Sequence, residues 1–500
     1  MNLHDLFAIP KHRSPDKIAI HALDATPAPT SLTFADLYAA VDRVAAGLQQ
    51  WGLRKGDRVA FFINSRPELI IAYLAVIRLG AVVVPINLRY RRLEIGHILT
   101  DCTPRLLVTE SAQLPILDEV GADKASVEAL LLAEEFDRWQ APADQVQLPL
   151  VESDDLALII YTSGTTGRSK GAMITHNNVI ATVTGLLAAW AWQPQDKLLL
   201  CLPLFHTHGL IVGLHCALAA GATVLLRAQF EAKTIMADLL SGEPTLFFAV
   251  PTIYVRLVEE LKQQPQPDFS HLRLFCSGSA PLAAETFVAF QELTGHTILE
   301  RYGMTETGMN LSNPYIGERI AGSVGTPLPG VSMRIVDHKG VDVPVGGEGE
   351  LLVRGSNVFS AYWNAPEKTA ASFSHDALGQ QWFHTGDLAR QDPQNGYVTL
   401  LGRRHELIIS GGFNIYPREI EEMLTTYPGI AEAAVIGAPH PEWGEVPVAY
   451  LVCTAEIDQE DLVRYCRGQL ASFKVPRTIH HVEALPRNAM GKLQKNLLKG

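Results

Sequence analysis

A glycine- and hydroxyl-rich segment, residues 161–171, carries the strongest chemical signal in the sequence. It follows the apolar run 156–160 and has glycines at positions 164, 167 and 171. Glycines permit sharp turns that aim backbone N–H groups at a phosphate, and the hydroxyls and Lys170 add donors and positive charge. A Walker A loop does not fit, because Ser169 precedes Lys170 and Gly171 follows it. A flexible surface loop is the plainer alternative. The segment predicts a phosphate-binding turn.

Three shorter segments offer groups of the same kind. Residues 277–281 read Ser-Gly-Ser-Ala-Pro after an expected strand at 272–276, and residues 300–307 place an aromatic ring, hydroxyls and a carboxylate close together. Residues 384–387, His-Thr-Gly-Asp, supply a carboxylate after a tight turn. Each is weak by itself. Their order, with residues 402–403 and 486–492 behind them, is not a coincidence.

Together these segments resemble the acyl-adenylate-forming superfamily of acyl-CoA synthetases, luciferases and peptide-synthetase adenylation domains. The resemblance runs over about residues 15–500. It implies an enzyme that joins a carboxylic acid to AMP, using ATP and Mg²⁺, and then passes the acyl group to coenzyme A. One departure is Ser169, where many relatives have proline; this affects the stiffness of the loop and leaves the chemistry unchanged.

The resemblance also implies a role for individual residues. Those implied to bind ATP are Thr162, Ser163, Gly164, Thr165, Thr166, Gly167 and Lys170 at the β- and γ-phosphates, Gly278, Ser279 and Ala280 along the adenine, Tyr302 stacked on it with Glu300 and Gly303 beside it, and Asp387 and Arg403 at the ribose. Those implied to act are Thr305 at the α-phosphate, Glu306 as the Mg²⁺ ligand and Lys492 as the catalytic lysine, while Ser410, Gly411 and Gly412 border the pantetheine channel.

Physical chemistry supports such roles independently. A carboxylate that attacks a negatively charged phosphate needs cations to offset the repulsion, and Lys492 and a metal held by Glu306 supply them. No side-chain nucleophile is required. The second step needs Lys492 to leave so that a thiol can approach, which calls for a hinge between domains. The resemblance puts this hinge at His405, for which an ordinary exposed linker position is the alternative.

A closer resemblance, to malonyl-CoA synthetases, rests on residues 203–209, 300–314 and 486–495. Burying the distal carboxylate of a short diacid is costly unless an arginine pairs with it. Arg301 and Arg256 are the candidates; each has a structural alternative, pairing with a neighbouring carboxylate or lying along an apolar surface. His206 and Thr207 are expected to line the acyl pocket and Met309 to narrow its floor. A metal site at His206 and His208 is disfavoured, because no third ligand is near.

Other functions compete with this interpretation. A ligase for fatty or aromatic acids would use the same fold, with both arginines structural. A stand-alone adenylation enzyme would load a separate carrier protein. A catalytically inactive nucleotide-binding protein is disfavoured because Glu306, Asp387 and Lys492 are all present. Luciferase-type oxygenation is disfavoured on substrate grounds.

The elements that must position these residues alternate between helix and strand. Apolar residues at three- and four-residue steps predict a helix between Thr33 and Gly52, followed by strands near 58–63 and 81–85 and a helix at 67–79. This alternation predicts an α/β fold with mainly parallel sheets flanked by helices. After about residue 330 the pattern changes to short strands with turns, and the last hundred residues predict helix 417–425, strand 431–436 and helix 460–470. We expect a large N-terminal domain, 1–403, with a small β-rich part, and a small mobile α+β domain, 404–500.

The amino-acid composition restricts the class of protein, its compartment and its binding partners. A formal charge of −12 argues against nucleic-acid binding, and 47% hydrophobic with 19% charged residues is ordinary for a globular protein. The six cysteines lie far apart and form no CxxC pair, which predicts free thiols in a reducing compartment. No signal peptide or membrane span is expected, so the protein is predicted to be cytoplasmic. The segment around Lys492 resembles that of regulated acyl-CoA synthetases, which makes acetylation of this lysine an expectation. The sequence gives no oligomeric state.

Overall fold

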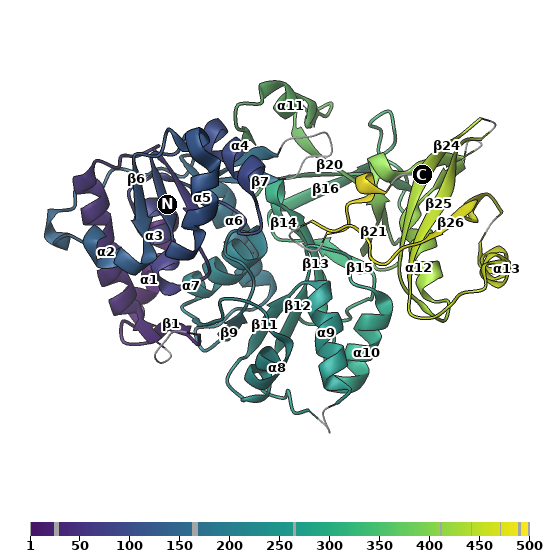
Figure 1. Ribbon diagram of the computed structural model, residues 1–500, viewed down its shortest axis with the longest axis horizontal. Helices are drawn as coiled ribbons and strands as arrows, with labels where there is room; N and C mark the ends of the chain where they lie inside the picture. Colours follow the sequence, from purple (N-terminus) through teal and green to yellow (C-terminus); the bar gives the residue numbers. More distant parts are fainter. Residues whose placement is uncertain are drawn as a thin grey trace. The chain divides into compact units, whose positions relative to one another are not determined.

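The chain folds into two compact units in a computed structural model (Figure 1). The structure describes residues 2–24, 30–162, 169–263, 267–410, 413–441, 443–470, 472–488 and 492–498. The first unit comprises Met1–Ser332 and Val353–Phe383, and the second comprises Met333–Leu352 and His384–Gly500. The expected domain boundary at residue 403 lies inside the second unit and stays a prediction.

One sheet of the first unit carries the predicted phosphate-binding segment. Its strands are ordered β18-β8-β7-β4-β3-β5-β6. Their bounds are β3 Arg58–Phe62, β4 Val82–Pro85, β5 Leu106–Thr109, β6 Ala129–Leu132, β7 Leu156–Thr162, β8 Lys170–Thr175 and β18 Ala361–Tyr362. β3 to β7 are parallel, whereas β8 runs antiparallel to β7 and β18. The core between this sheet and α4 (Arg92–Cys102) contains Phe62, Ile98 and Ile159.

The other sheet of this unit carries the remaining predicted site residues. Its strands follow the order β2-β1-β10-β9-β11-β12-β13-β14-β15. Their bounds are β1 Ile18–Ala22, β2 Thr30–Thr33, β9 Lys197–Leu200, β10 Thr223–Leu226, β11 Leu246–Ala249, β12 Leu274–Ser277, β13 Leu299–Met304, β14 Gly308–Ser312 and β15 Ser323–Pro327. The strands from β1 to β13 along this order are parallel, and β2, β14 and β15 pair antiparallel. Both sheets are therefore mainly parallel, as the alternating pattern predicts.

Helices connect these strands. They are α1 Leu3–Arg13, α2 Phe34–Trp51, α3 Pro67–Arg78, α4, α5 Leu114–Val120, α6 His176–Ala189, α7 Cys216–Ala220, α8 Ala232–Leu240, α9 Pro251–Leu261, α10 Ala284–Thr294 and α11 Pro366–Ala371, with a π-helix η5, His208–His215. α2 shows why the sequence signals work: the Thr33 hydroxyl accepts from the Asp36 N–H at 3.0 Å, and Gly52 closes the helix at φ 107°. Short 3-10 turns at Ser111–Gln113, Gly121–Lys124, Ala133–Trp139, Ala143–Gln145 and Thr305–Thr307 (η6) complete the unit.

The second unit is smaller and combines β-strands with helices. β16 Val331–Val336, β17 Glu348–Gly355, β20 Gln381–Gln391 and β21 Val398–Arg403 are neighbours in that order. β19 Phe373–His375 belongs to the first unit and pairs there with the first residues of β20, 381–383. A separate sheet, β23-β22-β25-β24 with β26 on β25, has the bounds β22 Ile408–Ser410, β23 Phe413–Ile415, β24 Ile430–His440, β25 Gly444–Cys453 and β26 Thr478–His481. It packs on α12 Pro417–Thr425 and α13 Gln459–Gln469, and 3-10 turns form at η7 Arg404–Glu406, η8 Ser472–Lys474 and η9 Lys495–Leu497.

These observations confirm the predicted fold class: a large α/β part with mainly parallel sheets, a small β-rich part and a small α+β part. Within the described ranges, no helix is long and apolar enough to span a bilayer.

Candidate active site

Glu306 is the centre of a small hydrogen-bonded group in the first unit. It lies in η6, the turn between β13 and β14, and its side chain is buried. Its Oε1 accepts from the Thr162 hydroxyl at 3.2 Å and from the Tyr362 hydroxyl at 3.0 Å. Both donors come from the other sheet, from β7 and β18. The two hydroxyls fix the orientation of this buried carboxylate.

The ends of the predicted phosphate loop lie beside this carboxylate. Thr162 and Lys170 face each other in the antiparallel pair β7–β8, so the segment between them begins and ends at one place. The Lys170 ammonium lies 5.2 Å from the Tyr362 ring centroid. Burial lowers the pKa of Lys170, as does Lys368, whereas the Glu306 charge raises it. The sheet therefore brings together a lysine, a hydroxyl and a buried carboxylate.

Residues 163–168, which include Ser163, Gly164, Thr165, Thr166 and Gly167, lie outside the described residues, and their predicted phosphate contacts stay predictions.

Arg301 is a charged residue of the site whose side chain is almost completely buried. It is 3% exposed on β13, and its Nε and Nη2 atoms have no hydrogen-bond partner among the described residues. Burial lowers the pKa of this guanidinium, while the neighbouring Cys276 raises it. A Cβ added to Gly278 would lie 2.5 Å from the Arg301 Cζ, so the guanidinium packs directly against the backbone after β12. The Nε–H and Nη2–H groups of this buried cation can therefore donate hydrogen bonds to an anion.

His208 and Ser279 extend the polar lining. The Ser279 hydroxyl and the His208 Nδ1 are 3.2 Å apart, while the His208 Nε2 has no partner among the described residues. Burial first, and then the charge of Arg301, holds the pKa of His208 well below its usual range. A neutral histidine whose Nδ1 accepts from the hydroxyl presents Nε2–H as a donor. Ser279 adopts a left-handed conformation, φ 73°, which non-glycine residues rarely adopt.

Several predicted pocket residues surround this group. Thr207 is buried and its hydroxyl has no partner in the part of the chain described here, whereas His206 is half-buried. Met309 is buried opposite Gly303 in the β13–β14 pair. A Cβ at Gly303 would come within 2.1 Å of the Gly308 carbonyl oxygen and 2.5 Å of the Met309 Cε. Glycine at 303 thus allows the Met309 side chain to lie across β13.

The remaining predicted residues of this unit differ in exposure. Tyr302 is buried, and its hydroxyl donates to the Met304 Sδ at 3.8 Å, while Thr305 and Ala280 are half-buried. The Glu300 Oε1 accepts from the Leu282 N–H at 3.2 Å, so this carboxylate supports the loop after β12. Arg256 is exposed on α9, and its contact with substrate stays a prediction.

In the second unit, Asp387 and Arg403 form the predicted pair. They face each other between β20 and β21, and the Arg403 Nε lies 2.9 Å from the Asp387 Oδ1. The Thr385 hydroxyl accepts from the Asp387 N–H at 3.1 Å, and the Arg403 Nη1 donates to the Thr385 carbonyl at 3.1 Å. The carboxylate is buried and oriented, as a ligand for two neighbouring hydroxyls would be.

The other predicted residues of this unit lie in and after the 404–406 turn. Lys492 is exposed in the segment before η9, and His405 lies in η7. Burial lowers the pKa of His405, as do the charges of Arg403 and Lys492, while Glu406 and Asp387 raise it. Ser410 is buried at the end of β22, and Gly411 and Gly412 lie outside the described residues.

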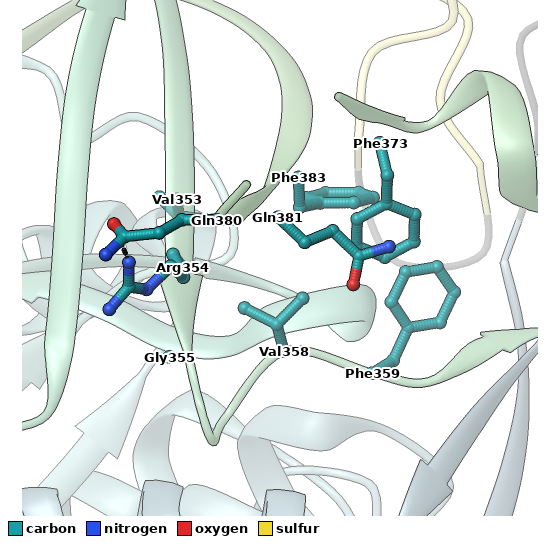
Figure 2. Close-up of a pocket in the computed structure, with 9 residues that line it drawn as sticks. All are labelled: Val353, Arg354, Gly355, Val358, Phe359, Phe373, Gln380, Gln381 and Phe383. Atoms are coloured by element: carbon teal, nitrogen blue, oxygen red, sulfur yellow. Dashed lines mark hydrogen bonds between the residues drawn. The ribbon is translucent and has the colours of Figure 1, made fainter. Parts of the chain in front are cut away.

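Two features were not found from the sequence. Tyr362, which binds Glu306, lies 56 residues further along the chain, and nothing in its local sequence connects it to that carboxylate. The second feature is a cavity of about 320 Å³ formed by segments 353–359 and 373–383. Figure 2 shows Phe359, Phe373 and Phe383 grouped on one side of it and the hydrogen-bonded pair Arg354 and Gln380 on the other.

This cavity is linked to the site through Phe359, whose N–H donates to the Glu306 carbonyl at 2.7 Å.

The residues present fit a magnesium ion that is shared with a nucleotide. In the described ranges, no group of three or more His, Cys, Asp or Glu side chains could hold a metal ion. Mg²⁺ in nucleotide-dependent enzymes is held by one or two carboxylates together with phosphate oxygens and water. Glu306, buried and approached by hydroxyls, fits that arrangement.

Comparisons with known proteins agree with this geometry. The model of the family described as AMP-binding enzyme matches residues 8–363, and that of the AMP-binding enzyme C-terminal domain matches residues 419–492. The mitochondrial malonate–CoA ligase ACSF3 of Mus musculus is 38% identical over 493 residues, covering 90% of this chain and 83% of the relative. A feruloyl-CoA synthase of an Amycolatopsis species is 36% identical over 486 residues, covering 96% of both chains.

The structural comparison points the same way. The crystal structure of ATP-bound MatB from Rhodopseudomonas palustris aligns with a TM-score of 0.90 and 40% identity, covering 99% of this chain and 98% of that one. The family resemblance inferred from the sequence is thus confirmed. The chain belongs to the AMP-binding enzyme family, in which it is an AMP-forming acyl-CoA synthetase that uses ATP, Mg²⁺ and coenzyme A.

Proposed function

We propose that this acyl-CoA synthetase acts on malonate or a small substituted malonate. The single observation that carries the proposal is the buried Arg301 guanidinium, whose Nε and Nη2 have no partner among the described residues. An unpaired buried cation destabilises the free enzyme. A second carboxylate on the substrate offsets that cost by accepting both N–H groups in the planar geometry that guanidinium favours.

The neighbouring donors suit the same carboxylate. His208 offers Nε2–H when its Nδ1 accepts from Ser279, and the buried Thr207 hydroxyl lacks a partner among the described residues. Arg301 lies close enough to His208 for its charge to lower the pKa of this histidine, and donors of this kind match the lone pairs of a carboxylate better than a hydrocarbon chain. Met309, buried opposite Gly303, would limit the length of the acid.

A fatty or aromatic acid is the second candidate, and the similar feruloyl-CoA synthase keeps it worth testing. Such an acid would leave Arg301 buried without an anion, which disfavours it. The similar malonate–CoA ligase supports the diacid. A role in loading a carrier protein has no specific observation in its favour.

The remaining residues divide the chemistry between the two steps. In our proposal, Thr162 and Lys170 border the β- and γ-phosphates, Glu306 holds the Mg²⁺ that lowers their charge, and Asp387 with Arg403 holds the ribose. Lys492 stabilises the negative charge that develops as the substrate carboxylate attacks the α-phosphate and pyrophosphate leaves. It must then move away so that the CoA thiol can attack the acyl carbon and release AMP.

A panel of acids tests the proposal. The purified protein is assayed for AMP release that requires both ATP and CoA, with malonate, methylmalonate, butyrate, hexanoate, benzoate and ferulate. We expect malonate to give the highest kcat/KM, with methylmalonate weaker if Thr207 and Met309 crowd the α-carbon. Preference for hexanoate, benzoate or ferulate would replace the diacid with the second candidate.

A further inference from the structure

A mostly buried lysine three residues after Lys492 has no role in the chemistry described so far. Lys495 begins η9, and its side chain is 13% exposed. Its ammonium lies 2.7 Å from the Glu421 Oε1 and 3.0 Å from the Glu406 Oε2. Glu421 comes from α12 and Glu406 from η7. One side chain thus ties three separate segments of the second unit together.

These ties begin three residues after Lys492. The Lys492 carbonyl accepts from the Asn488 N–H at 2.8 Å, and the Lys492 N–H donates to the Asn488 Oδ1 at 3.0 Å. Arg487 and Leu493 form an antiparallel bridge, and the Gln494 N–H donates to the Pro486 carbonyl at 2.8 Å. Contacts between residues 486–488 and 492–494 therefore hold the backbone of Lys492, and we call these two stretches the Lys492 loop; the ion-paired Lys495 side chain follows directly after them.

The positions of the Glu421 and Glu406 carboxylates depend on the charge of Lys495. Burial raises the pKa of Glu421, while Lys495 lowers it and Glu406 raises it further. Burial lowers the pKa of Lys495, but the charges of Glu421 and Glu406 outweigh burial and raise it overall. The Glu421 Oε1 also accepts from the Val435 N–H at 2.7 Å, which fixes this carboxylate to β24. Without the ammonium, the two carboxylates would repel each other and Glu406 would turn away.

We infer that Lys495 is a positioning residue that fixes the Lys492 loop to the 404–406 turn and to α12, and that it acts on adenylation through Lys492. The inference rests on the adenylation role proposed for Lys492. It explains why a lysine is ion-paired with two carboxylates at a mostly buried position, where an apolar residue of similar size would often be at least as stabilising. The 404–406 turn is also the expected hinge, so the loop and the hinge would move as one body.

The test separates the two half-reactions in the full-length protein. Adenylation is followed by malonate-dependent exchange of pyrophosphate into ATP, and thioesterification by CoA transfer from pre-made malonyl-adenylate. The variants are Lys495→Met, Lys495→Arg and Lys492→Ala, and the double variant Lys492→Ala/Lys495→Met. Lys474→Met is the matched control: the Lys474 ammonium lies 2.7 Å from Glu419, also on α12, and belongs to a different segment.

We expect Lys495→Met to lower exchange by ~10- to 100-fold, the usual effect of misplacing a group that contacts the reacting atoms. Thioesterification should stay near the wild-type rate, Lys495→Arg should restore most of the exchange, and Lys474→Met should change neither. Because Lys495 acts through Lys492, the double variant should be no worse than Lys492→Ala.

Loss of both half-reactions together in Lys495→Met, or an additive double variant, would show a general structural role and overturn the inference. Normal exchange in Lys495→Met beside the expected loss in Lys492→Ala would overturn the positioning role alone. Normal exchange in Lys492→Ala would overturn the proposed role of Lys492 and, with it, this inference. Melting temperatures of all variants identify any that fail to fold.

Discussion

At the scale of single residues, the site is defined by buried charges that the described residues leave partly uncompensated. Glu306 is a buried carboxylate that accepts from two hydroxyls, and Arg301 is a buried guanidinium with two N–H groups unpaired among the described residues. In our proposal, Mg²⁺ binds to Glu306 and the second carboxylate of the substrate binds to Arg301. On this proposal, binding of the correct ligand offsets the free-energy cost of burying each charge.

Tyr362→Phe tests the orientation of Glu306. The variant removes one hydroxyl donor and leaves the ring beside Lys170. We expect kcat/KM for ATP to fall roughly tenfold or more, because a hydrogen bond to a charged group contributes ~1.5–3 kcal/mol. The Mg²⁺ concentration for half-maximal activity should rise. An unchanged Mg²⁺ titration would mean that Tyr362 does not orient the metal ligand.

Tyr427→Phe is the matched control for this variant. The Tyr427 hydroxyl donates to the Asp461 Oδ2 at 2.8 Å at an exposed position of the second unit. The Tyr427→Phe variant removes the same hydroxyl oxygen from a tyrosine–carboxylate pair, and we expect its Mg²⁺ titration to match that of the wild type.

At the scale of secondary-structure elements, the site is assembled where strands end. β7 ends at Thr162, β12 at Ser277 and β13 at Met304, and the predicted site residues follow these ends or lie next to them. In α/β proteins, ligands bind beyond the carboxyl ends of parallel strands. The close approach of Arg301 to Gly278 shows how little space lies between two such strands.

Gly278→Ala tests that close approach. The new Cβ would lie 2.5 Å from the Arg301 Cζ, so the guanidinium must shift. We expect the preference for malonate over butyrate to fall by ~10-fold or more, since displacing a binding group by about 1 Å can cost ~100-fold. Gly468→Ala is the control, because no atom lies within 4 Å of its Cβ position in α13. An unchanged preference for malonate over butyrate in Gly278→Ala would show that Arg301 does not take part in substrate binding.

Many of the helices and strands can be predicted from the sequence, because the patterns that predict them lie within a few residues of each other. The helix Pro417–Thr425 and the Thr33 cap of α2 are confirmed, and the predicted strand 156–160 extends to Thr162. The strand expected at 431–436 is longer, Ile430–His440, because its cross-strand partner β25 continues the ladder past any local signal.

The features of the site that could not be predicted from the sequence depend on contacts between distant segments. Tyr362 reaches Glu306 only because β18 pairs with β8 at the edge of the other sheet. The sequence suggests His208 only as a disfavoured metal ligand, because its hydrogen bond to Ser279 joins residues 71 positions apart. That the Arg301 Nε and Nη2 have no hydrogen-bond partner among the described residues follows from which segments pack there, and no periodicity in the sequence predicts that packing.

At the scale of the whole molecule, our proposal requires two groups of the second unit to act one after the other. Lys492 serves the first step in our proposal, and the 410–412 segment serves the second. Both follow the 404–406 turn in the second unit. A change at this turn should therefore affect one step without the other.

His405→Pro tests the hinge. Proline fixes φ near ~−65° and restricts rotation about the turn. We expect pyrophosphate exchange to survive while formation of malonyl-CoA collapses. The two half-reactions are measured separately, as for the Lys495 variants. If both fall together, or neither falls, the hinge lies elsewhere.

The central claim is that this enzyme recognises a diacid by its second charge, and one comparison tests it most directly. It is the ratio of kcat/KM for malonate to that for butyrate, measured in the wild type and in Arg301→Met, a variant that removes the charge and keeps an unbranched side chain. Losing a charge-assisted pair costs ~2–5 kcal/mol, or roughly thirty- to several-thousand-fold. We predict a wild-type ratio of at least about one hundred, most of which Arg301→Met abolishes while the KM for ATP stays near normal. A wild-type ratio near unity, or a ratio that Arg301→Met leaves unchanged, would contradict the account.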